Sequence, residues 1–155
     1  MEIRRFEERD AVEVSALIAK TLRTSNIKDY SHEHIENDVK ALTPEYLINQ
    51  AQNRHSYTFI EDGIIVGCGT IGSYWGVPDE YSLFCIFVLP EYQGKGIGRK
   101  IIETLEQDEY FLAAKRVEIP ASITATKFYR KMGYGYKNGV SEPDEERLVR
   151  MEKFR

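Results

Sequence analysis

The sequence lacks several features that mark particular classes of protein. It has only two cysteines, Cys68 and Cys85, which is too few for a disulfide framework, and they show no metal-ligand spacing. No apolar run approaches membrane-spanning length, and no N-terminal stretch has the order of a signal peptide. The net charge is −4 at pH 7, so nucleic acid and anionic membranes are not expected as partners. We therefore expect a cytoplasmic protein with both cysteines reduced.

The residues that are present describe an ordinary globular protein. Hydrophobic residues make up 42% of the chain and charged residues 30%. A chain of 155 residues is long enough to bury most of the surface that it exposes when unfolded. Internal repeats, low-complexity segments and Pro/Ser-rich linkers are absent, so nothing marks a domain boundary. We predict a single domain over residues 1–155.

The hydrophobic pattern predicts a strand, helices, three strands, and then helix, strand, helix and strand. The expected strands lie at residues 1–6, in a hairpin within 55–75, and at 81–89, 116–122 and 146–154. One expected helix follows Asp10, two span 31–42 and 43–51, one starts near Ile97, and the last spans 124–132. This order predicts a mixed α/β (α+β) domain and not a regular βαβ repeat.

Short polar motifs predict where some of these elements begin and turn. Asp10, with Glu13 reaching back, is expected to cap the first helix. Ser31 and Thr43 are expected to cap the next two helices. The pair Asp62-Gly63 predicts the turn of the hairpin.

The stretch "PEYQGKGIGRKI", residues 90–101, contains glycines at three alternate positions between a predicted strand and a predicted helix. Free N–H groups and the dipole at a helix N-terminus attract anions, and glycine lets the backbone approach a phosphate. Arg99 and Lys100 would oppose the dipole in this first turn unless an anion were bound. The alternative is a glycine-rich turn with solvated charges.

Two general phosphate motifs do not explain this stretch. The Walker A pattern fails because Gly96 follows Lys95 and Leu89 stands where the first glycine belongs. The dinucleotide fingerprint also fails here. It matches at Gly67, Gly69 and Gly72, but no helix follows that match.

A third motif fits. The segment "VLPEYQGKGIGRKIIETLE" resembles the acetyl-coenzyme A signature [QR]-x-x-G-x-[GA] of the GNAT N-acetyltransferase superfamily, with Gln93, Gly96 and Gly98 at its fixed positions. Downstream, "ASITATKFYRKMGY" resembles the family segment A-S-x-x-A-x-x-F-Y-x-x-x-G-[YF]. The order of elements also matches over nearly the whole chain, although the N-terminal half matches by pattern more than by motif.

The resemblance implies a mostly antiparallel central sheet, flanked by helices, that splays between two parallel strands, here 81–89 and 116–122. Acetyl-coenzyme A (acetyl-CoA) would lie in that cleft as a cosubstrate, without a metal. Its pantetheine arm would pair with the strand edge near Phe87 and Val88, and its pyrophosphate would bind the backbone of residues 93–99. The implied cofactor-binding residues are Phe87, Val88, Gln93, Gly94, Lys95, Gly96, Ile97, Gly98, Arg99, Lys100, Ser122, Ala125 and Phe128.

The same resemblance implies acetyl transfer to an amine, with Tyr129 as the acid near the thioester sulfur. The competing interpretation of Tyr129 is core packing within a helical apolar stripe. Many relatives carry a carboxylate on the strand before the glycine loop, in the region that reads Ser82 to Cys85 here, and this chain has none in that region. Glu80, which shares strand parity with Ser82 and Phe84, is a candidate base acting through water, but it could equally be a solvated turn residue. A water-relayed or substrate-supplied deprotonation is also open.

The acceptor is expected to be a small-molecule or peptide amine, and its pocket residues are expected to include Tyr30, His32, Tyr74 and Trp75. His32 and His34 lack a third ligand, so we expect no metal there. Two other functions stay open: a non-catalytic sensor that binds acetyl-CoA, or an acyltransferase of this fold with another acyl group or a hydroxyl acceptor. A homodimer is suggested by analogy alone.

Overall fold

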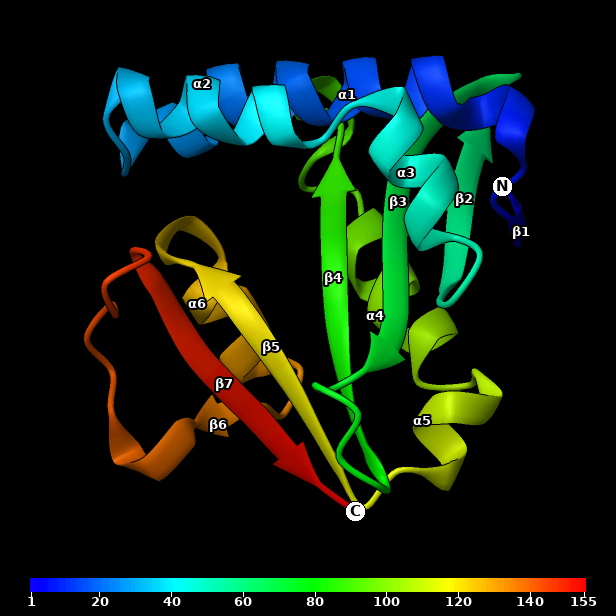
Figure 1. The fold of residues 1–155 in the computed structure, drawn as a ribbon. Coiled ribbons are helices and arrows are strands. Elements are labelled where there is room, and N and C mark those ends of the chain that lie inside the picture. The colour runs from blue at the N-terminus through cyan, green and yellow to red at the C-terminus, as the bar shows by residue number, and fades with distance from the viewer.

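The computed structural model describes residues 1–155 as a seven-stranded sheet in the order β1-β2-β3-β4-β5-β7-β6 (Figure 1). The strands are β1 (Glu2–Arg5), β2 (His55–Glu61), β3 (Ile64–Ser73), β4 (Glu80–Val88), β5 (Arg116–Ser122), β6 (Gly135–Tyr136) and β7 (Leu148–Phe154). All neighbouring strands are antiparallel except β4 and β5. The predicted mixed, mostly antiparallel sheet is confirmed.

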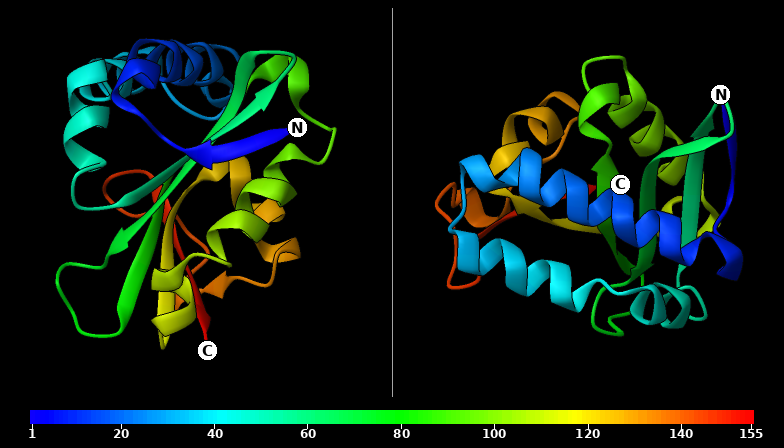
Figure 2. Two further views of the ribbon diagram at one scale, coloured as in Figure 1. Left: turned by 90° about the vertical axis from the view of Figure 1, so that its right-hand side faces the viewer. Right: turned by 90° about the horizontal axis from the view of Figure 1, so that it is seen from above.

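Helices lie on both sides of this sheet, as the side view in Figure 2 shows. They are α1 (Ala11–Thr24), α2 (His32–Ala41), α3 (Pro44–Gln50), α4 (Ile97–Leu105), α5 (Glu109–Ala113) and α6 (Thr126–Lys131). The apolar stripe of α1 packs with α2, α3 and residues of β3 in one buried cluster, and α4, α5 and residues of β3, β4, β5 and β7 form a larger one. The sheet is therefore held from both faces.

Local sequence explains most element boundaries. The Ser31 hydroxyl accepts a hydrogen bond from the His34 amide at 3.1 Å, and the Thr43 hydroxyl accepts one from the Tyr46 amide at 3.1 Å. Asp62 and Gly63 both have positive φ, 51° and 76°, as the hairpin turn between β2 and β3 requires. These predicted caps and the predicted turn are confirmed.

The predicted cap at Asp10 is wrong in detail. Its carboxylate instead accepts hydrogen bonds from the Arg4 guanidinium at 2.8 and 2.9 Å and from the Glu7 amide at 2.8 Å. Glu13 does not reach back but accepts from the Ile65 amide at 2.9 Å. The two carboxylates therefore tie the start of α1 to β1 and β3.

Helix α5 and the short strand β6 were not predicted. Helix α5 starts at Asp108, which caps the Tyr110 amide at 2.8 Å and also accepts hydrogen bonds from His55 and Tyr57 of β2. These long-range contacts hold a helix that is too short to show a hydrophobic period. Strand β6 has only two residues, Gly135 and Tyr136.

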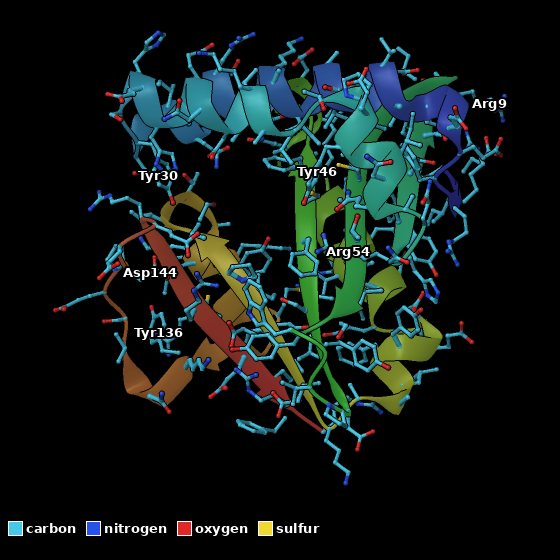
Figure 3. The ribbon with its side chains drawn as sticks, viewed as in Figure 1. Arg9, Tyr30, Tyr46, Arg54, Tyr136 and Asp144 are labelled. Carbon is cyan, nitrogen blue, oxygen red and sulfur yellow. The ribbon has the colours of Figure 1, made fainter.

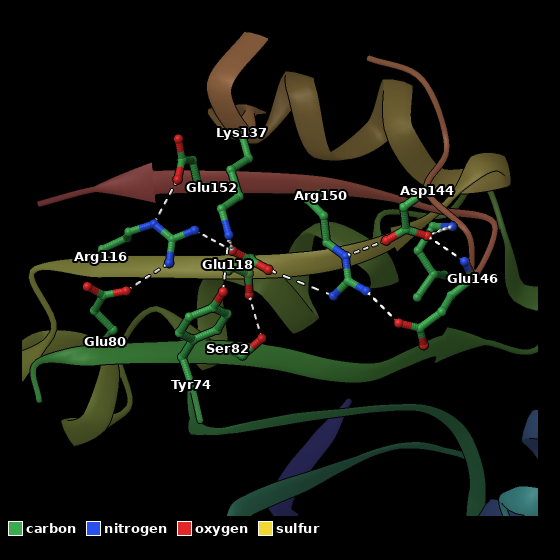
Figure 4. A network of polar contacts seen from close by, with 11 residues as sticks. Tyr74, Glu80, Ser82, Arg116, Glu118, Lys137, Asp144, Glu146, Arg150 and Glu152 are labelled. Atoms are coloured by element: carbon green, nitrogen blue, oxygen red, sulfur yellow. Dashed lines mark hydrogen bonds and ion pairs between the residues drawn. The ribbon is translucent and has the colours of Figure 1, made fainter. Parts of the chain in front are cut away.

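Charged side chains tie β4, β5 and β7 together where these strands converge (Figure 4). The Arg116 guanidinium of β5 donates to Glu80 of β4 at 2.9 Å, to Glu152 of β7 at 2.7 Å, and to the buried Glu118. Lys137 also lies 2.9 Å from Glu118. We call the group Glu80, Arg116, Glu118, Lys137 and Glu152 the closed-end network.

Candidate active site

Strands β4 and β5 run side by side over only a few residues and then diverge. Their register comprises Glu80↔Arg116, Tyr81↔Val117 and Ser82↔Glu118. Beyond Ser82 the two strands separate toward α1 and α2, so the sheet opens into a V (Figure 1). Between its arms lies a cleft of about 710 Å³, lined mostly by hydrophobic residues. The edge of β4 from Leu83 to Val88 therefore faces the cleft without a partner strand on that side.

A β-bulge bends β4 inside this cleft. Cys68 of β3 pairs with Phe87, whereas Thr70 pairs with Phe84, so β4 contains one extra residue between these pairs. Cys85 has a positive φ of 50° and lines the cleft. A bulge of this kind increases the local bend and twist of a strand, which helps β4 to leave β5. Both cysteines are free thiols.

The glycine-rich loop presents free backbone amides to the cleft. The amides of residues 94–99 donate to no protein acceptor, and the first helical bond of this region runs from the Lys100 amide to the Gly96 carbonyl at 3.1 Å. Gly94 and Gly96 have φ of 77° and 84°, which is the left-handed region that favours glycine. These amides stand at the N-terminus of α4, where the helix dipole is positive. The loop is thus shaped to hold an anion.

Gln93 and Gly98 have different roles from the two left-handed glycines. The Gln93 side-chain amide donates to the Val88 carbonyl at 3.0 Å and to the Ser25 hydroxyl at 3.2 Å, so it fixes the loop to β4 and α1. A Cβ on Gly98 would lie 3.2 Å from the Phe128 ring of α6. Gly98 therefore lets α6 approach α4 across the cleft.

Tyr129 of α6 is the buried phenol of the site. It is 5% exposed and lines the cleft, and its hydroxyl has no hydrogen bond from the protein. Burial raises the pKa of Tyr129 above its ordinary value near 10, because desolvation disfavours the phenolate. Its ring packs between those of Phe128 and Tyr134. The side chain is therefore a neutral phenol, held rigidly by its neighbours, with a free proton donor at the cleft.

The opposite wall of the cleft carries a stacked tyrosine and histidine. The Tyr30 hydroxyl donates to the Arg147 carbonyl and accepts from the Ile123 amide, both at 2.8 Å, so it joins the helical side to the tips of β5 and β7 (Figure 3). Its ring stacks on His34 with centroids 4.4 Å apart. The Nε2 atom of His34 lies 3.3 Å from a carboxylate oxygen of Asp38. Burial raises the pKa of Asp38, and the nearby His34 partly opposes that shift.

The structure brings most of the predicted site residues together. Those lining the cleft are Tyr30, Phe87, Val88, Gln93, Gly94, Gly96, Ile97, Gly98, Arg99, Ser122, Ala125, Phe128 and Tyr129. Lys95 and Lys100 are exposed on the same loop and first turn but do not line the cleft. His32 is exposed at the first position of α2.

Three predicted residues lie at the opposite end of β4. Glu80 accepts a hydrogen bond from Arg116 in the closed-end network and does not line the cleft. Tyr74 accepts from the Lys137 ammonium at 3.1 Å, beside the same network. Trp75 is 86% exposed in the loop between β3 and β4.

Other cleft residues were not predicted as part of the site, among them His34, Asp38, Tyr46 and Cys85. The spacing of Tyr30, His34 and Asp38 at every fourth residue is a signal that could have placed them on one face. Cys85 lies within an almost wholly apolar segment and gives no such signal. No group of three or more His, Cys, Asp or Glu side chains is arranged to hold a metal ion. No helix has both the length and the hydrophobicity to cross a membrane.

Comparisons with known proteins point in one direction. The family described as "Acetyltransferase (GNAT) domain" matches residues 26–154. No curated protein matches the chain at a significant level.

Solved structures share the fold. The PaiA N-acetyltransferase from Thermoplasma acidophilum, crystallised with coenzyme A, has a TM-score of 0.83 and 19% identity, covering 99% of this chain and 98% of that one. A GNAT family acetyltransferase from Brucella melitensis with acetyl-CoA has a TM-score of 0.62 and 27% identity, covering 86% and 81%. YncA from Salmonella typhimurium, also with acetyl-CoA, has a TM-score of 0.68 and 18% identity, covering 99% and 93%.

Proposed function

Because the chain belongs to the GNAT acetyltransferase family, we propose that it transfers an acetyl group from acetyl-CoA to an amine of a small molecule or peptide. The observation that carries this proposal is the row of unbonded amides at residues 94–99, which opens onto the cleft at the N-terminus of α4. The oxygens of a diphosphate can accept hydrogen bonds from such backbone amides, so no particular side chain is needed to bind it. Structures of the same fold that contain coenzyme A or acetyl-CoA support this assignment.

In this proposal the amides of the loop bind the pyrophosphate, and Lys95, Arg99 and Lys100 supply positive charge around it. The unpaired edge of β4 receives the pantetheine arm as an added strand would be received. The Val88 carbonyl already accepts hydrogen bonds from Gln93 and Thr21, so the pairing falls on the residues before it, near Phe87. Ser122, Ala125 and Phe128 line the other side of the arm.

Tyr129 is proposed as the acid. The amine nitrogen forms a bond to the thioester carbonyl carbon, and the carbon–sulfur bond breaks. The departing thiolate takes a proton from the Tyr129 hydroxyl, which is free to donate because the protein offers it no acceptor. The nitrogen, which carries a surplus proton after attack, releases that proton to solvent, and solvent reprotonates the phenolate. A phenol whose pKa is raised stays protonated at neutral pH and is available as a donor in every cycle.

We place the base on His34, because an alkyl ammonium with a pKa near ~10 must lose a proton before attack. His34 lines the cleft, and a carboxylate oxygen of Asp38 lies 3.3 Å from its Nε2 atom, so the imidazole ring is held in place. Glu80, the residue suggested by strand parity, is ion-paired with Arg116 at 2.9 Å outside the cleft. The His34–Asp38 pair is the only histidine–carboxylate pair among the cleft-lining residues.

The experiment that tests this function measures release of free thiol from acetyl-CoA with a panel of primary amines. Mass spectrometry then identifies the acetylated product. Thermal unfolding with and without coenzyme A measures binding separately, since a ligand that binds only the folded state raises the midpoint. Thiol release with an amine supports the proposal. Protection by coenzyme A without thiol release from any acceptor would instead identify a sensor, and absence of protection would remove the cofactor assignment.

A further inference from the structure

Arg54 is a partly buried cation without a counter-ion. It lies between α3 and β2, and no carboxylate approaches it within the 4.0 Å of an ion pair, whereas every other lysine or arginine that is not fully exposed has such a partner. Those paired cations are Arg4, Arg116, Lys137, Arg150 and Lys153. A cation removed from water without a partner destabilises the folded protein. A partly buried guanidinium without a carboxylate partner therefore suggests that a bound ligand supplies the negative charge.

The sheet is shaped to receive this side chain. Gly72 of β3 leaves the space, because a Cβ there would lie 2.5 Å from the Arg54 Cγ. The guanidinium carbon then lies 4.2 Å from the ring centre of Phe84. Phe84 lines the cleft and Arg54 itself does not, so Arg54 adjoins the cleft through this ring. In Figure 3, Arg54 and Tyr46, which also lines the cleft, lie on the same face of β3 and β4.

Most of the hydrogen-bonding capacity of the guanidinium is unused. Its Nη1 atom donates to the Gln50 side-chain oxygen at 3.1 Å, and no other protein acceptor contacts it. The Gln50 side-chain nitrogen in turn lies 3.8 Å from the Cys85 sulfur. Gln50 thus orients one edge of the guanidinium and leaves the remaining N–H groups available.

We propose that Arg54 binds a carboxylate of the acceptor, so that the substrates are amines that also carry a carboxylate group. This inference rests on the proposed acetyl transfer. A planar guanidinium matches a carboxylate with two parallel hydrogen bonds. Phe84 screens one face of the guanidinium from water, which strengthens that interaction. The amine would then lie toward the β4 bulge, with the carboxylate toward α3.

The test compares acceptors that differ only in the carboxylate: ω-amino acids of increasing length, their amides, and the matching alkylamines. We expect kcat/KM for the best amino acid to exceed that of its amide by about 10-fold to 100-fold, the worth of a hydrogen bond to a charged group. Arg54→Met retains the packing on Gly72 and Phe84 and should abolish this ratio, mainly by raising KM for the amino acid. Gly72→Ala keeps the charge but displaces the side chain, and should reduce the ratio as well.

Arg5→Met is the matched control. Arg5 also stacks on an aromatic ring, that of Tyr57 at 5.5 Å, and has no carboxylate partner, but it lies on β1 and its ring partner, unlike Phe84, does not line the cleft. It should leave the ratio unchanged. Equal rates for amino acids and their amides, or a ratio that survives Arg54→Met, would overturn the inference while acetyl transfer to amines still stood. Preference for aminoalkyl phosphates over amino acids would overturn the choice of a carboxylate. Absence of thiol release with every amine would instead remove the proposed function itself.

Discussion

At the scale of single residues, glycines that look equivalent in the sequence are required for different physical reasons. Gly94 and Gly96 are needed for their backbone conformation, with φ of 77° and 84°. Gly98 is needed for space, because Phe128 fills the position of its missing side chain. A substitution at each type of position should therefore fail in a different way.

Gly96→Ala forces a Cβ into a left-handed conformation at the start of α4. We expect a loss of about 1 kcal/mol in unfolding free energy and a clear weakening of coenzyme A binding, because the neighbouring amides turn away. Gly139→Ala is the control, since its φ of 73° is similar and no neighbouring atom would lie within 4 Å of the added Cβ. Urea unfolding should show similar losses for both variants, whereas calorimetry should show weaker binding for Gly96→Ala alone. Equal coenzyme A affinity in the two variants would contradict the role of the loop.

The proposed acid and base make a paired prediction. Tyr129→Phe and His34→Gln should each lower kcat by about 10²-fold to 10⁴-fold, with little loss of stability for Tyr129→Phe, because its hydroxyl has no protein partner. Tyr134→Phe is the control, since its hydroxyl donates to Glu106 at 2.9 Å and it does not line the cleft.

The pH profile checks the same assignment. The pKa of Tyr129 is raised by burial, so the phenol keeps its proton and no decline in rate from its ionisation should occur below pH ~10. His34→Gln should lower kcat over the whole pH range, whereas Glu80→Gln should not. If Glu80→Gln lowers kcat instead, the base lies at Glu80.

The sequence predicted much of this site and missed a definable part of it. Gly96 and Tyr129 lie in the two sequence motifs, the glycine-rich loop and the segment of α6. Their positions follow from the local sequence, and both were predicted. His34 was noted in the sequence only as one of two histidines without a third metal ligand. Cys85 lines the cleft because a bulge in β4 brings it there. Arg54 lies against Phe84 through the packing of α3 and β3. Such long-range packing leaves no local pattern in the sequence.

At the scale of secondary-structure elements, the closed-end network joins the two arms of the sheet. Glu118 is 1% exposed, so its charge is compensated by Arg116 and Lys137 and not by water. A buried pair of this kind adds little by itself, but removing one partner leaves the other charge uncompensated. The network therefore makes the junction of β4, β5 and β7 sensitive to single substitutions.

Arg116→Met should lower the unfolding free energy by about 3 kcal/mol. It removes contacts to Glu80, Glu118 and Glu152 together. Arg150→Met should cost less, since its closest partners, Asp144 and Glu146, are solvent-exposed residues and it lies 3.8 Å from Glu118, farther than Arg116 and Lys137 do. Urea unfolding at pH 7 measures both variants. Losses of the same size would show that the burial of the network does not matter.

Secondary-structure elements were predicted where neighbouring residues in the sequence mark them. The hairpin of β2 and β3 and the helices α2 and α3 are marked in the sequence by a turn or a cap. The parallel contact of β4 with β5 was expected only from the resemblance to a family. Helix α5 was missed because Asp108 is held by His55 and Tyr57, whose contribution depends on the completed sheet.

At the scale of the whole molecule, the net charge of −4 conceals a local excess of positive charge. Lys95, Arg99 and Lys100 are exposed at the mouth of the glycine-rich loop and form no ion pair with the protein. An acidic protein can therefore attract a polyanion at one place, because local fields and not the net charge govern short-range association.

Binding of coenzyme A should accordingly depend on salt. Exposed charges are screened within about 10 Å at 0.1 M ionic strength, so the Kd should rise several-fold between low and high salt. Arg99→Gln should weaken binding at low salt and flatten this dependence, whereas Lys28→Gln, at an exposed lysine that does not line the cleft, should do neither. Calorimetric titrations over a salt series measure the effect. Identical slopes for Arg99→Gln and the wild type would show that these charges do not act on the ligand.

The brief parallel pairing of residues 80–82 with residues 116–118 also bears on how the chain reaches its native state. Strands β2, β3 and β4 pair with neighbours in sequence, whereas β4 joins β5 only after the intervening segment has folded back, and contacts between distant segments form late. We expect hydrogen exchange during refolding to protect the β2–β4 meander before β5. A ribosome-bound chain that ends before β5 would then hold a folded meander and no binding cleft.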